Sequence, residues 1–314
     1  MHSVGTSNLL ALIPHPSSPH ARPCPGKHVV AATAAAHVEV REARPGLEAL
    51  RQTLAACPVT EQEAEGSSAG HPPPPGARTR DELLADLPIS PAELDAALEG
   101  LGAFVMDGRW RVLDARCCAE VVKMVLLTVV EHGWTTFRVP RDEAIEKTAK
   151  ADLRAEVVAG ALAAVAAPTP GGAEGELAID MARVAKVHAR ALLCGRAEWP
   201  AAELETAVRT QLPEEARDSV DVAGALRGEA VTVGQPGAPV TVALPAYALT
   251  TEPAARFQAM FAVKQRWTRQ EMAPYLEGLD VPGVTDEELL LRYARETKGG
   301  GDVPATWSAR YSFQ

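Results

Sequence analysis

The side chains best suited to acid–base or metal chemistry are few and poorly spaced. His188 and Cys194 lie six residues apart on one expected helix, and no second ligand stands four residues from His188. Cys117 and Cys118 are adjacent, which is poor geometry for binding one metal ion together. The acidic run 286–288 opens an expected helix, where it complements the helix dipole. These groups therefore favour structural roles over chemical ones.

Longer signatures of chemistry are missing from the sequence as well. It holds no phosphate loop, dinucleotide glycine pattern, HExxH, EF-hand loop or GxSxG. The five cysteines show no CxxC spacing, which favours reduced thiols over a disulfide framework or a zinc site. We expect no enzyme, and we predict no catalytic residue, metal or cofactor.

Basic residues near the end of the chain form the more informative pattern. The whole chain carries a net charge of −10, yet residues 254–314 hold eight Lys and Arg against eight Asp and Glu. Arg292, Arg295 and Lys298 cover an arc of about 120° on a helix predicted over 285–300. Arg310 lies in an expected strand over 306–312. Such an edge is either a solvated face or a surface for DNA phosphates.

The elements that would position these residues recur along the chain. Residues 81–87 and 90–104 predict two helices, the second with Ser90 and Glu93 as a capping box. A hairpin follows, turning at Asp107-Gly108. Helices followed by a β-hairpin are the winged-helix order, and the pattern repeats three more times. Trp134, Trp199 and Trp267 each follow a long helix where a first strand should begin, which indicates a shared core role.

This pattern predicts a mostly α fold with small β-wings, an α+β class of tandem winged helices. A strand-like segment over 7–14, a second over 37–42 and a helix from Pro45 precede them. We predict a Pro/Ser/Gly linker over 60–78. The expected domains are 1–59, a remnant of a sheet plus one helix; 79–180, the first winged-helix region with room for two units; 181–250, the second; and 251–314, the third.

The sequence gives no membrane or export signal. No apolar run reaches the ~18 residues that span a bilayer, and the apolar stretch 121–130 includes Lys123. The first thirteen residues lack a basic start and a cleavage site. An intracellular, soluble protein is the expectation.

The C-terminal residues resemble a known family. KQRWT at 264–268, APYLEGL at 273–279 and LLLRYAR at 289–295 are similar to the closing module of the Dcc family, "defective in sister chromatid cohesion". Residues 40–55 and the wing at 108–113 are similar to the same family in the same order. Residues 6–14 resemble the end of the family's amino-terminal β-barrel segment.

This resemblance implies a subunit of an alternative clamp loader like replication factor C. Such proteins form a β-barrel with the other cohesion-specific subunits, and their winged helices bind DNA and the catalytic subunit of DNA polymerase epsilon. The complex loads or unloads PCNA, ATP is hydrolysed in other subunits, and the place of action is the nucleus. The family's DNA-contacting basic positions fall on Arg292, Lys298 and Arg310, and Arg295 joins them through the helical wheel.

Two points qualify the resemblance. Met1 stands just before the barrel-like segment, so most of that barrel is expected to be missing, which puts assembly in doubt. A winged-helix transcription regulator that binds specific DNA is the alternative function, although the acidic net charge and the lack of an evident dimerisation helix argue against it. An unrecognised enzyme is the third interpretation.

Overall fold

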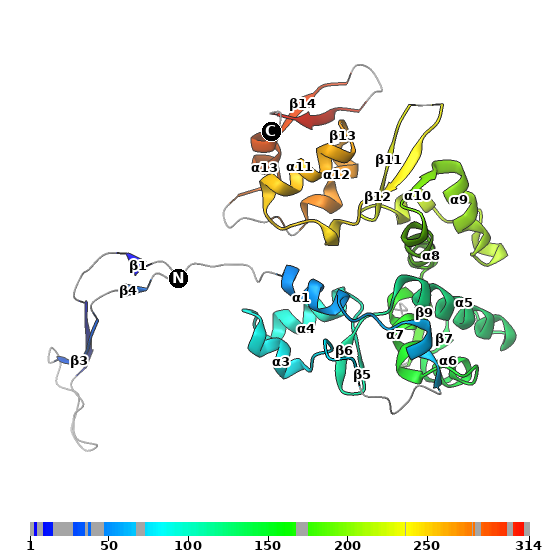
Figure 1. Ribbon diagram of the computed structural model, residues 1–314, viewed down its shortest axis with the longest axis horizontal. Coiled ribbons are helices and arrows are strands. Elements are labelled where there is room, and N and C mark those ends of the chain that lie inside the picture. Colours follow the sequence, from blue (N-terminus) through cyan, green and yellow to red (C-terminus); the bar gives the residue numbers. More distant parts are fainter. Residues whose placement is uncertain are drawn as a thin grey trace. The chain divides into compact units, whose positions relative to one another are not determined.

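A computed structural model gives the architecture in two compact units, Met1–Arg44 and Pro45–Gln314 (Figure 1). The structure describes residues 47–66, 73–167, 175–235, 237–277, 279, 284–299 and 304–310, together with the backbone of four strands before residue 39.

The first unit is built from short antiparallel pairs of strands. β2 (Leu9–Pro14) pairs with β3 (His28–Ala34), and β1 (Ser3–Val4) pairs with β4 (His37–Val38). The strand predicted over 7–14 is therefore confirmed as β2. Of the strand predicted over 37–42, residues 37–38 form β4 and the others lie outside the described residues. The sequence pattern did not predict β3.

The second unit repeats one order of elements: helix, strand, two helices and two strands. We call residues 115–179 repeat 2, residues 181–243 repeat 3 and residues 253–309 repeat 4. Repeat 2 contains α5 (Ala115–Glu131), β7 (Val139–Pro140), α6 (Arg141–Ala149), α7 (Ala155–Val165), β8 (Ala166–Ala167) and β9 (Glu176–Ile179).

Repeats 3 and 4 follow the same order. Repeat 3 contains α8 (Met181–Gly195), β10 (Glu198–Pro200), α9 (Ala201–Thr210), α10 (Val222–Ala225), β11 (Ala230–Val233) and β12 (Val240–Ala243). Repeat 4 contains α11 (Pro253–Val263), β13 (Trp267–Thr268), α12 (Arg269–Leu276), α13 (Asp286–Tyr293), β14 (Ala294–Thr297) and β15 (Thr306–Ala309).

A related set of elements, repeat 1 (residues 47–113), precedes these three. It contains α1 (Leu47–Ala55), α2 (Glu61–Ala64), α3 (Arg80–Asp86), α4 (Pro91–Gly100), β5 (Phe104–Met106) and β6 (Arg109–Arg111). The helix α2 lies inside the stretch predicted as a linker. Gly66 donates a backbone hydrogen bond to Asp152, so this part of the stretch belongs to the fold.

Each of repeats 2 to 4 closes on a three-stranded antiparallel sheet with one topology. The orders are β7-β9-β8, β10-β12-β11 and β13-β15-β14, so the last strand always lies in the middle. Trp199 lies in β10 and Trp267 in β13, at the first strand of their repeats. Trp267 is fully buried, as the recurrent position predicts.

Local signals fix several of the element boundaries. Capping boxes at Ser90, Thr268 and Thr285 begin α4, α12 and α13, which satisfies backbone donors at each helix start. Asp107 and Gly108 have φ angles of 52° and 74°, the left-handed pair that a tight hairpin turn requires. The capping box at Ser90 and the turn at Asp107-Gly108 confirm the predictions made for them.

The last predicted helix is wrong in its length. The sequence pattern predicts that it continues to residue 300, but α13 ends at Tyr293 and Ala294 is extended, with φ −126° and ψ 160°. The reason is a long-range pairing, because residues 294–297 form an antiparallel ladder with β15 that buries Ala294. The helical pattern of the sequence contains no information about that partner strand.

Apolar side chains gather into three cores. One core in repeat 1 is formed around Leu50, Leu83, Leu94 and Leu98. A second runs through repeats 2 and 3, where α5 packs against α8, and a third fills repeat 4. The fold is thus mixed α and β with small antiparallel sheets. Within the described residues, no helix is both long and apolar enough to cross a membrane.

Candidate nucleic-acid interface

The four basic residues predicted as a DNA edge do not share one helix. Arg292 lies in the last turn of α13, Arg295 lies in β14, and Lys298 directly follows that strand. Arg310 directly follows β15. The arc of 120° is therefore wrong beyond Arg292, because the helix ends before Arg295 and Lys298. All four residues still lie in repeat 4 or directly after it, around the hairpin β14–β15.

Arg310 and Arg292 have identifiable structural contacts. The Arg310 guanidinium donates a hydrogen bond to the Leu291 carbonyl oxygen, and its backbone N–H donates to Tyr293. These bonds satisfy carbonyl groups at the end of α13 that no helical N–H can reach. The Arg292 guanidinium lies 5.7 Å from the centroid of the Tyr293 ring, a cation–π contact. Arg310 thus helps to close the helix end.

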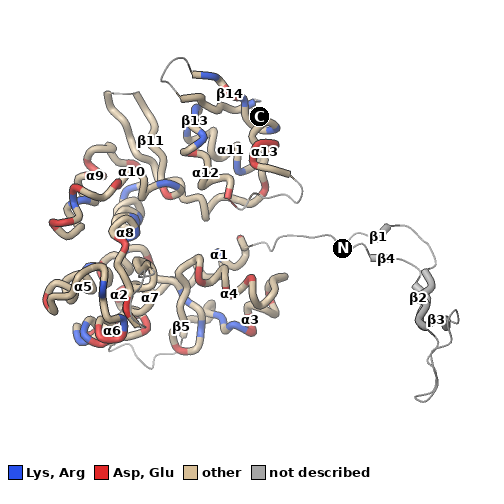
Figure 2. The backbone as a smooth tube through the Cα atoms, turned by 180° about the vertical axis from the view of Figure 1, so that it is seen from behind, with Lys and Arg blue, Asp and Glu red and all other residues tan. Residues whose placement is uncertain are grey.

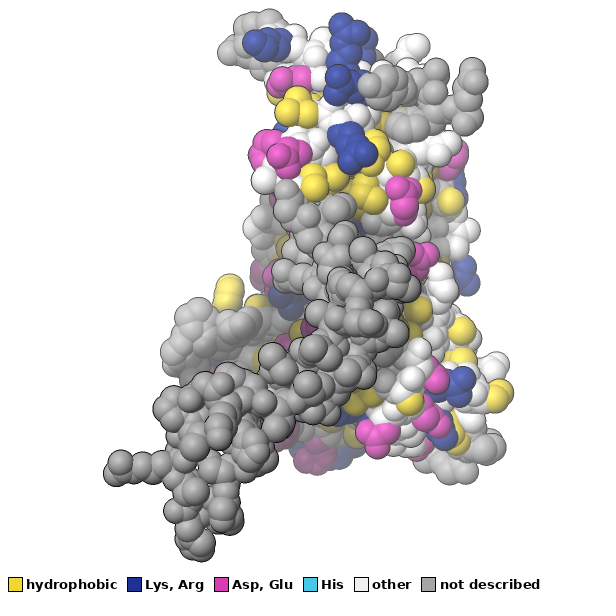
Figure 3. All heavy atoms as spheres, turned by 90° about the vertical axis from the view of Figure 1, so that its left-hand side faces the viewer, with side chains coloured by type: hydrophobic (Ala, Val, Ile, Leu, Met, Phe, Trp, Pro, Cys, Tyr) yellow, Lys and Arg dark blue, Asp and Glu magenta, His cyan; other side chains and the backbone are white. Residues whose placement is uncertain are grey.

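All four residues are exposed, but Arg295 and Lys298 make none of the contacts described for Arg292 and Arg310. Both side chains face solvent, and Arg295 stands opposite Ser308 in the ladder between β14 and β15. No ion pair joins Arg292, Arg295 or Lys298 to an acidic side chain among the described residues. Figure 2 shows Lys and Arg positions along β14 and near the C-terminal end. In Figure 3, Lys and Arg side chains gather toward the top of the view.

Most basic side chains of repeats 1 to 3 are neutralised instead. Arg154 donates to both carboxylate oxygens of Asp107, at 2.9 and 2.7 Å. Arg190 and Lys186 both pair with the buried carboxylate of Glu229. Arg80 pairs with Asp95 at 2.8 Å. Arg295 and Lys298, which have no ion pair among the described residues, therefore differ from most basic residues of repeats 1 to 3.

Sequence reasoning missed Arg266. It lies between α11 and β13, is exposed, and has no ion pair among the described residues. The only sequence signal was its place immediately before Trp267, the buried start of the first strand in repeat 4.

The residues considered for acid–base chemistry are His188, Cys117 and Cys118, and all three are shielded from solvent by the packing of the fold. His188 is 4% exposed between α8 and α5, its Nε2 has no hydrogen-bond partner, and burial lowers its pKa. Burial also raises the pKa of Cys117 to about 12 and that of Cys118 to about 11, which keeps both thiols protonated at neutral pH. Among the described residues, no cluster of His, Cys, Asp and Glu could hold a metal ion.

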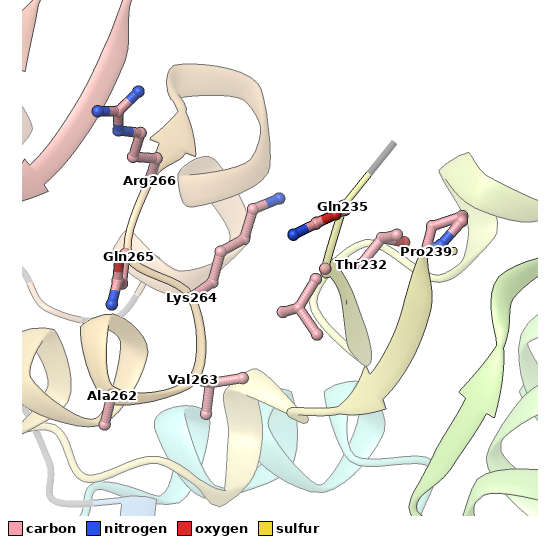
Figure 4. Close-up of a pocket in the computed structure, with 10 residues that line it drawn as sticks. Thr232, Gln235, Pro239, Ala262, Val263, Lys264, Gln265 and Arg266 are labelled. Carbon is pink, nitrogen blue, oxygen red and sulfur yellow. The ribbon is translucent and has the colours of Figure 1, made fainter. Parts of the chain in front are cut away.

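A hollow of about 610 Å³ lies between the hairpin β11–β12 and the segment that joins α11 to β13 (Figure 4). Lys264 points toward Gln235 across it, while Arg266 points away. The Lys264 ammonium already binds Glu271 at 2.7 Å. Of the described residues that line the hollow, none is a carboxylate, histidine or cysteine. The hollow thus offers no acid–base pair, and surfaces are the better candidates for a site.

Comparison with known proteins identifies the family. A sequence model described as "Sister chromatid cohesion protein Dcc1" matches residues 1–276. The chain is 22% identical to Sister chromatid cohesion protein DCC1 of Homo sapiens over 267 residues, which is 84% of this chain and 65% of that protein. The corresponding protein of Danio rerio is 24% identical over 266 residues, covering 84% of this chain and 66% of that one.

Longer alignments exist with amphibian relatives. Sister chromatid cohesion protein DCC1 of Xenopus tropicalis is 24% identical over 309 residues, which is 94% of this chain and 76% of that protein. The chain therefore spans about 65% of the length of the human relative and somewhat more of the frog one. With the family model matched over residues 1–276, this chain belongs to the Dcc1 family of sister chromatid cohesion proteins.

Proposed function

We propose that this chain is a non-catalytic scaffold that acts in sister chromatid cohesion and DNA replication. The observation that carries the proposal is the family match over residues 1–276, because relatives that align with most of the chain are named for cohesion. A chromosomal role places the protein in the nucleus. The protein would act through binding surfaces rather than through a catalytic cleft, in keeping with the burial of His188 and the protonated thiol of Cys117.

The repeats of the second unit are proposed to be winged helices. Each has the order helix, strand, helix, helix, strand, strand, and each ends in a hairpin whose last strand lies between the other two. This is the order in which a helix-turn-helix core carries a β-wing. We retain the domain division of the sequence: residues 79–180 as the first winged-helix region, 181–250 as the second and 251–314 as the third, with residues 1–59 as a barrel remnant plus one helix.

The proposed setting is an alternative clamp loader. In it, the first unit would join a β-barrel of the other cohesion-specific subunits, and the winged helices would dock the catalytic subunit of DNA polymerase epsilon. The complex would thereby link the loading or unloading of PCNA to the leading strand. Arg292, Arg295, Lys298 and Arg310 are the proposed DNA-binding residues, and no bound cofactor is required.

The test is co-purification of the full chain with the polymerase epsilon catalytic subunit and, separately, with the other cohesion-specific subunits. The proposal predicts a complex that survives gel filtration at micromolar concentration. Failure to bind either partner would remove the scaffold function. A transcription regulator would instead discriminate strongly between DNA sequences, so equal affinity for unrelated duplexes with a steep salt dependence supports the scaffold.

A further inference from the structure

Repeat 2 exposes a group of large apolar side chains at the end of its first helix. Six large apolar side chains are exposed among the described residues, and three of them fall between residues 127 and 137. Leu127 and Val130 of α5 are 62% and 71% exposed, and Phe137 in the turn after α5 is 74% exposed. Scattered apolar residues on a surface need no explanation, whereas a group of them marks an interaction site.

The exposed side chains of α5 belong to a second apolar stripe, separate from the one that builds the core. The core stripe includes Val122 and Val125, which are fully buried. Met124, Leu127 and Val130 follow one another at intervals of three residues, so they are neighbours on the helix surface. A helix that packs only against its own core carries polar side chains on such a face. The second stripe is therefore available to a further element.

This stripe forms one wall of a groove. A hollow of about 520 Å³ lies between α5 and the end of α6, two helices that pack against each other (Figure 1). Met124 and Leu127 line it from α5. Lys147, in the last turn of α6, and Lys150, which caps that helix, line it from the other side. We call the space between residues 124–132 and 147–151 the α5–α6 groove.

The polar groups at the bottom of the groove already have partners. The buried Thr128 hydroxyl donates to the Met124 carbonyl oxygen at 3.0 Å, and the buried Thr148 hydroxyl donates to Thr128 Oγ1 at 3.1 Å. At the rim, His132 Nδ1 lies 3.0 Å from the Thr128 carbonyl oxygen, and the His132 ring stacks on Trp134. Because these groups are satisfied, the bottom of the groove favours an apolar side chain over a polar ligand.

The second wall of the groove is cationic. Lys147 has no ion pair among the described residues. Lys150 lies 3.2 Å from Glu146, but both side chains are exposed, and such pairs are weak. Glu131 is the one carboxylate among the described residues that line the groove. An apolar wall thus faces a wall with two lysines.

We propose that the α5–α6 groove binds an amphipathic helix of a partner protein, whose apolar stripe packs on Leu127 and its neighbours and whose acidic edge lies beside Lys147 and Lys150. Such a helix presents apolar side chains at intervals of three and four residues, which matches the spacing of the α5 stripe. Glutamate or aspartate next to that stripe would complement the charge of the lysine wall. The inference goes beyond the proposed function, because it assigns a docking site and the chemistry of its occupant independently of DNA and of the polymerase.

The composition of the groove argues against two other occupants. Nucleic-acid backbones are held by cations and polar groups, so DNA would leave Leu127 and Val130 without apolar partners. In a twofold contact between two copies of this chain, the same patch would meet itself. The groove has two lysines and one carboxylate, so it is not complementary to itself in charge.

The test measures binding of the full chain to two labelled synthetic peptides by fluorescence anisotropy. Each peptide has about 18 residues, long enough to form a helix, with leucines along one face. The first peptide has glutamates beside the leucines, and the second has lysines at the same positions. We expect saturable binding of the glutamate peptide, at least about fivefold tighter than that of the lysine peptide.

Substitutions in the two walls locate the site. Leu127→Asp should weaken binding of the glutamate peptide at least about tenfold, because an apolar contact is lost and a carboxylate faces the acidic edge. Leu291→Asp, at a leucine of α13 that is 60% exposed, is the matched control and should leave binding unchanged. Lys147→Glu with Lys150→Glu should reverse the preference, so that the lysine peptide binds more tightly. Lys298→Glu is the control for charge, and thermal melts of each variant check folding.

Several outcomes would overturn the inference. If neither peptide binds, or if both bind equally well, the groove does not select an acidic helix. Equal losses from Leu127→Asp and Leu291→Asp would place the binding elsewhere on the chain. Displacement of the glutamate peptide by duplex DNA would assign the groove to nucleic acid, and self-association that Leu127→Asp abolishes would assign it to a second copy. Co-purification with the polymerase and the cohesion-specific subunits tests the scaffold function separately, so that function can stand when the groove fails.

Discussion

Two hairpins of the molecule use the same residue types in opposite ways. In repeat 1, Arg111 of β6 is 3% exposed and donates to the carbonyl oxygens of Cys57 and Pro58 and to Glu63. Its neighbour Arg109 pairs with Glu82 at 3.1 Å. In repeat 4, Arg295 of β14 and the following Lys298 are exposed and have no ion pair among the described residues.

The difference separates arginines that hold the fold from arginines that are available to a partner. A buried guanidinium that satisfies carbonyl groups and a carboxylate is part of the structure, since its removal leaves those groups unpaired. An exposed cation without a partner contributes little to folding and is available for phosphates. Residue type and net charge alone do not distinguish these two roles.

Removal of Arg111 should produce the largest loss of stability. Arg111→Met removes the hydrogen bonds that the guanidinium donates to the Glu63 carboxylate and to two carbonyl oxygens, so we expect the free energy of unfolding to fall by about 3 kcal/mol. Urea denaturation followed by circular dichroism measures it. The control is Arg295→Met, which should change stability by less than about 0.5 kcal/mol. Equal losses in the two variants would break the comparison.

A smaller loss is expected from the ion pair between repeats 1 and 2. Arg154→Gln removes the two hydrogen bonds to Asp107, and because that carboxylate is 34% exposed we expect only about 1 to 2 kcal/mol at neutral pH. The hydrogen bond from Arg154 lowers the pKa of Asp107. Its contribution is therefore complete above the unfolded value of about 3.9 and is lost as pH falls through the lower folded pKa.

Denaturation at pH 7 and at pH 3 tests the predicted loss of the stability contribution of the Arg154–Asp107 pair at low pH. The difference between the wild type and Arg154→Gln should shrink at the lower pH. A difference that grew on acidification would contradict the assignment of Asp107 as the ionised partner.

Substitution of His188 tests whether this buried residue of repeat 3 is neutral and has only a structural role. Burial lowers its pKa, so the folded protein resists protonation that the unfolded chain accepts, and stability should decline as pH falls below about 6.5. His188→Leu removes a buried Nε2 that has no partner and should reduce this decline without lowering stability at pH 7.5. We would compare thermal midpoints at several pH values. A steeper decline in the variant would contradict the buried, neutral histidine.

Local features of the fold could be predicted from the sequence. The turn at Asp107-Gly108 and the capping box at Ser90 depend on residues within four positions of one another, so their signals are complete in a short window. The order of helices and hairpins was predicted for the same reason. Membership of the family was predicted from the motifs near residues 264–295 and is confirmed by the family match.

Features set by distant partners could not be predicted. The strand β14 depends on its pairing with β15, so a helical pattern was extended through Arg295 and Lys298. Arg266 is brought to the sheet of repeat 4 only because β13, which it directly precedes, pairs with β15. The ion pairs of Arg154 and Arg190 join residues 47 and 39 positions apart. A helical wheel cannot show which cations are already neutralised.

The most direct test measures stability and DNA affinity on the same samples of two variants. Arg295→Gln with Lys298→Gln should weaken duplex binding and reduce its salt dependence while leaving the unfolding midpoint unchanged. Arg109→Gln, which removes the matched arginine of the other hairpin, should lower the midpoint and leave affinity unchanged. If the double variant binds DNA as tightly as the wild type, or if Arg109→Gln weakens binding as much, the distinction between the two hairpins is contradicted.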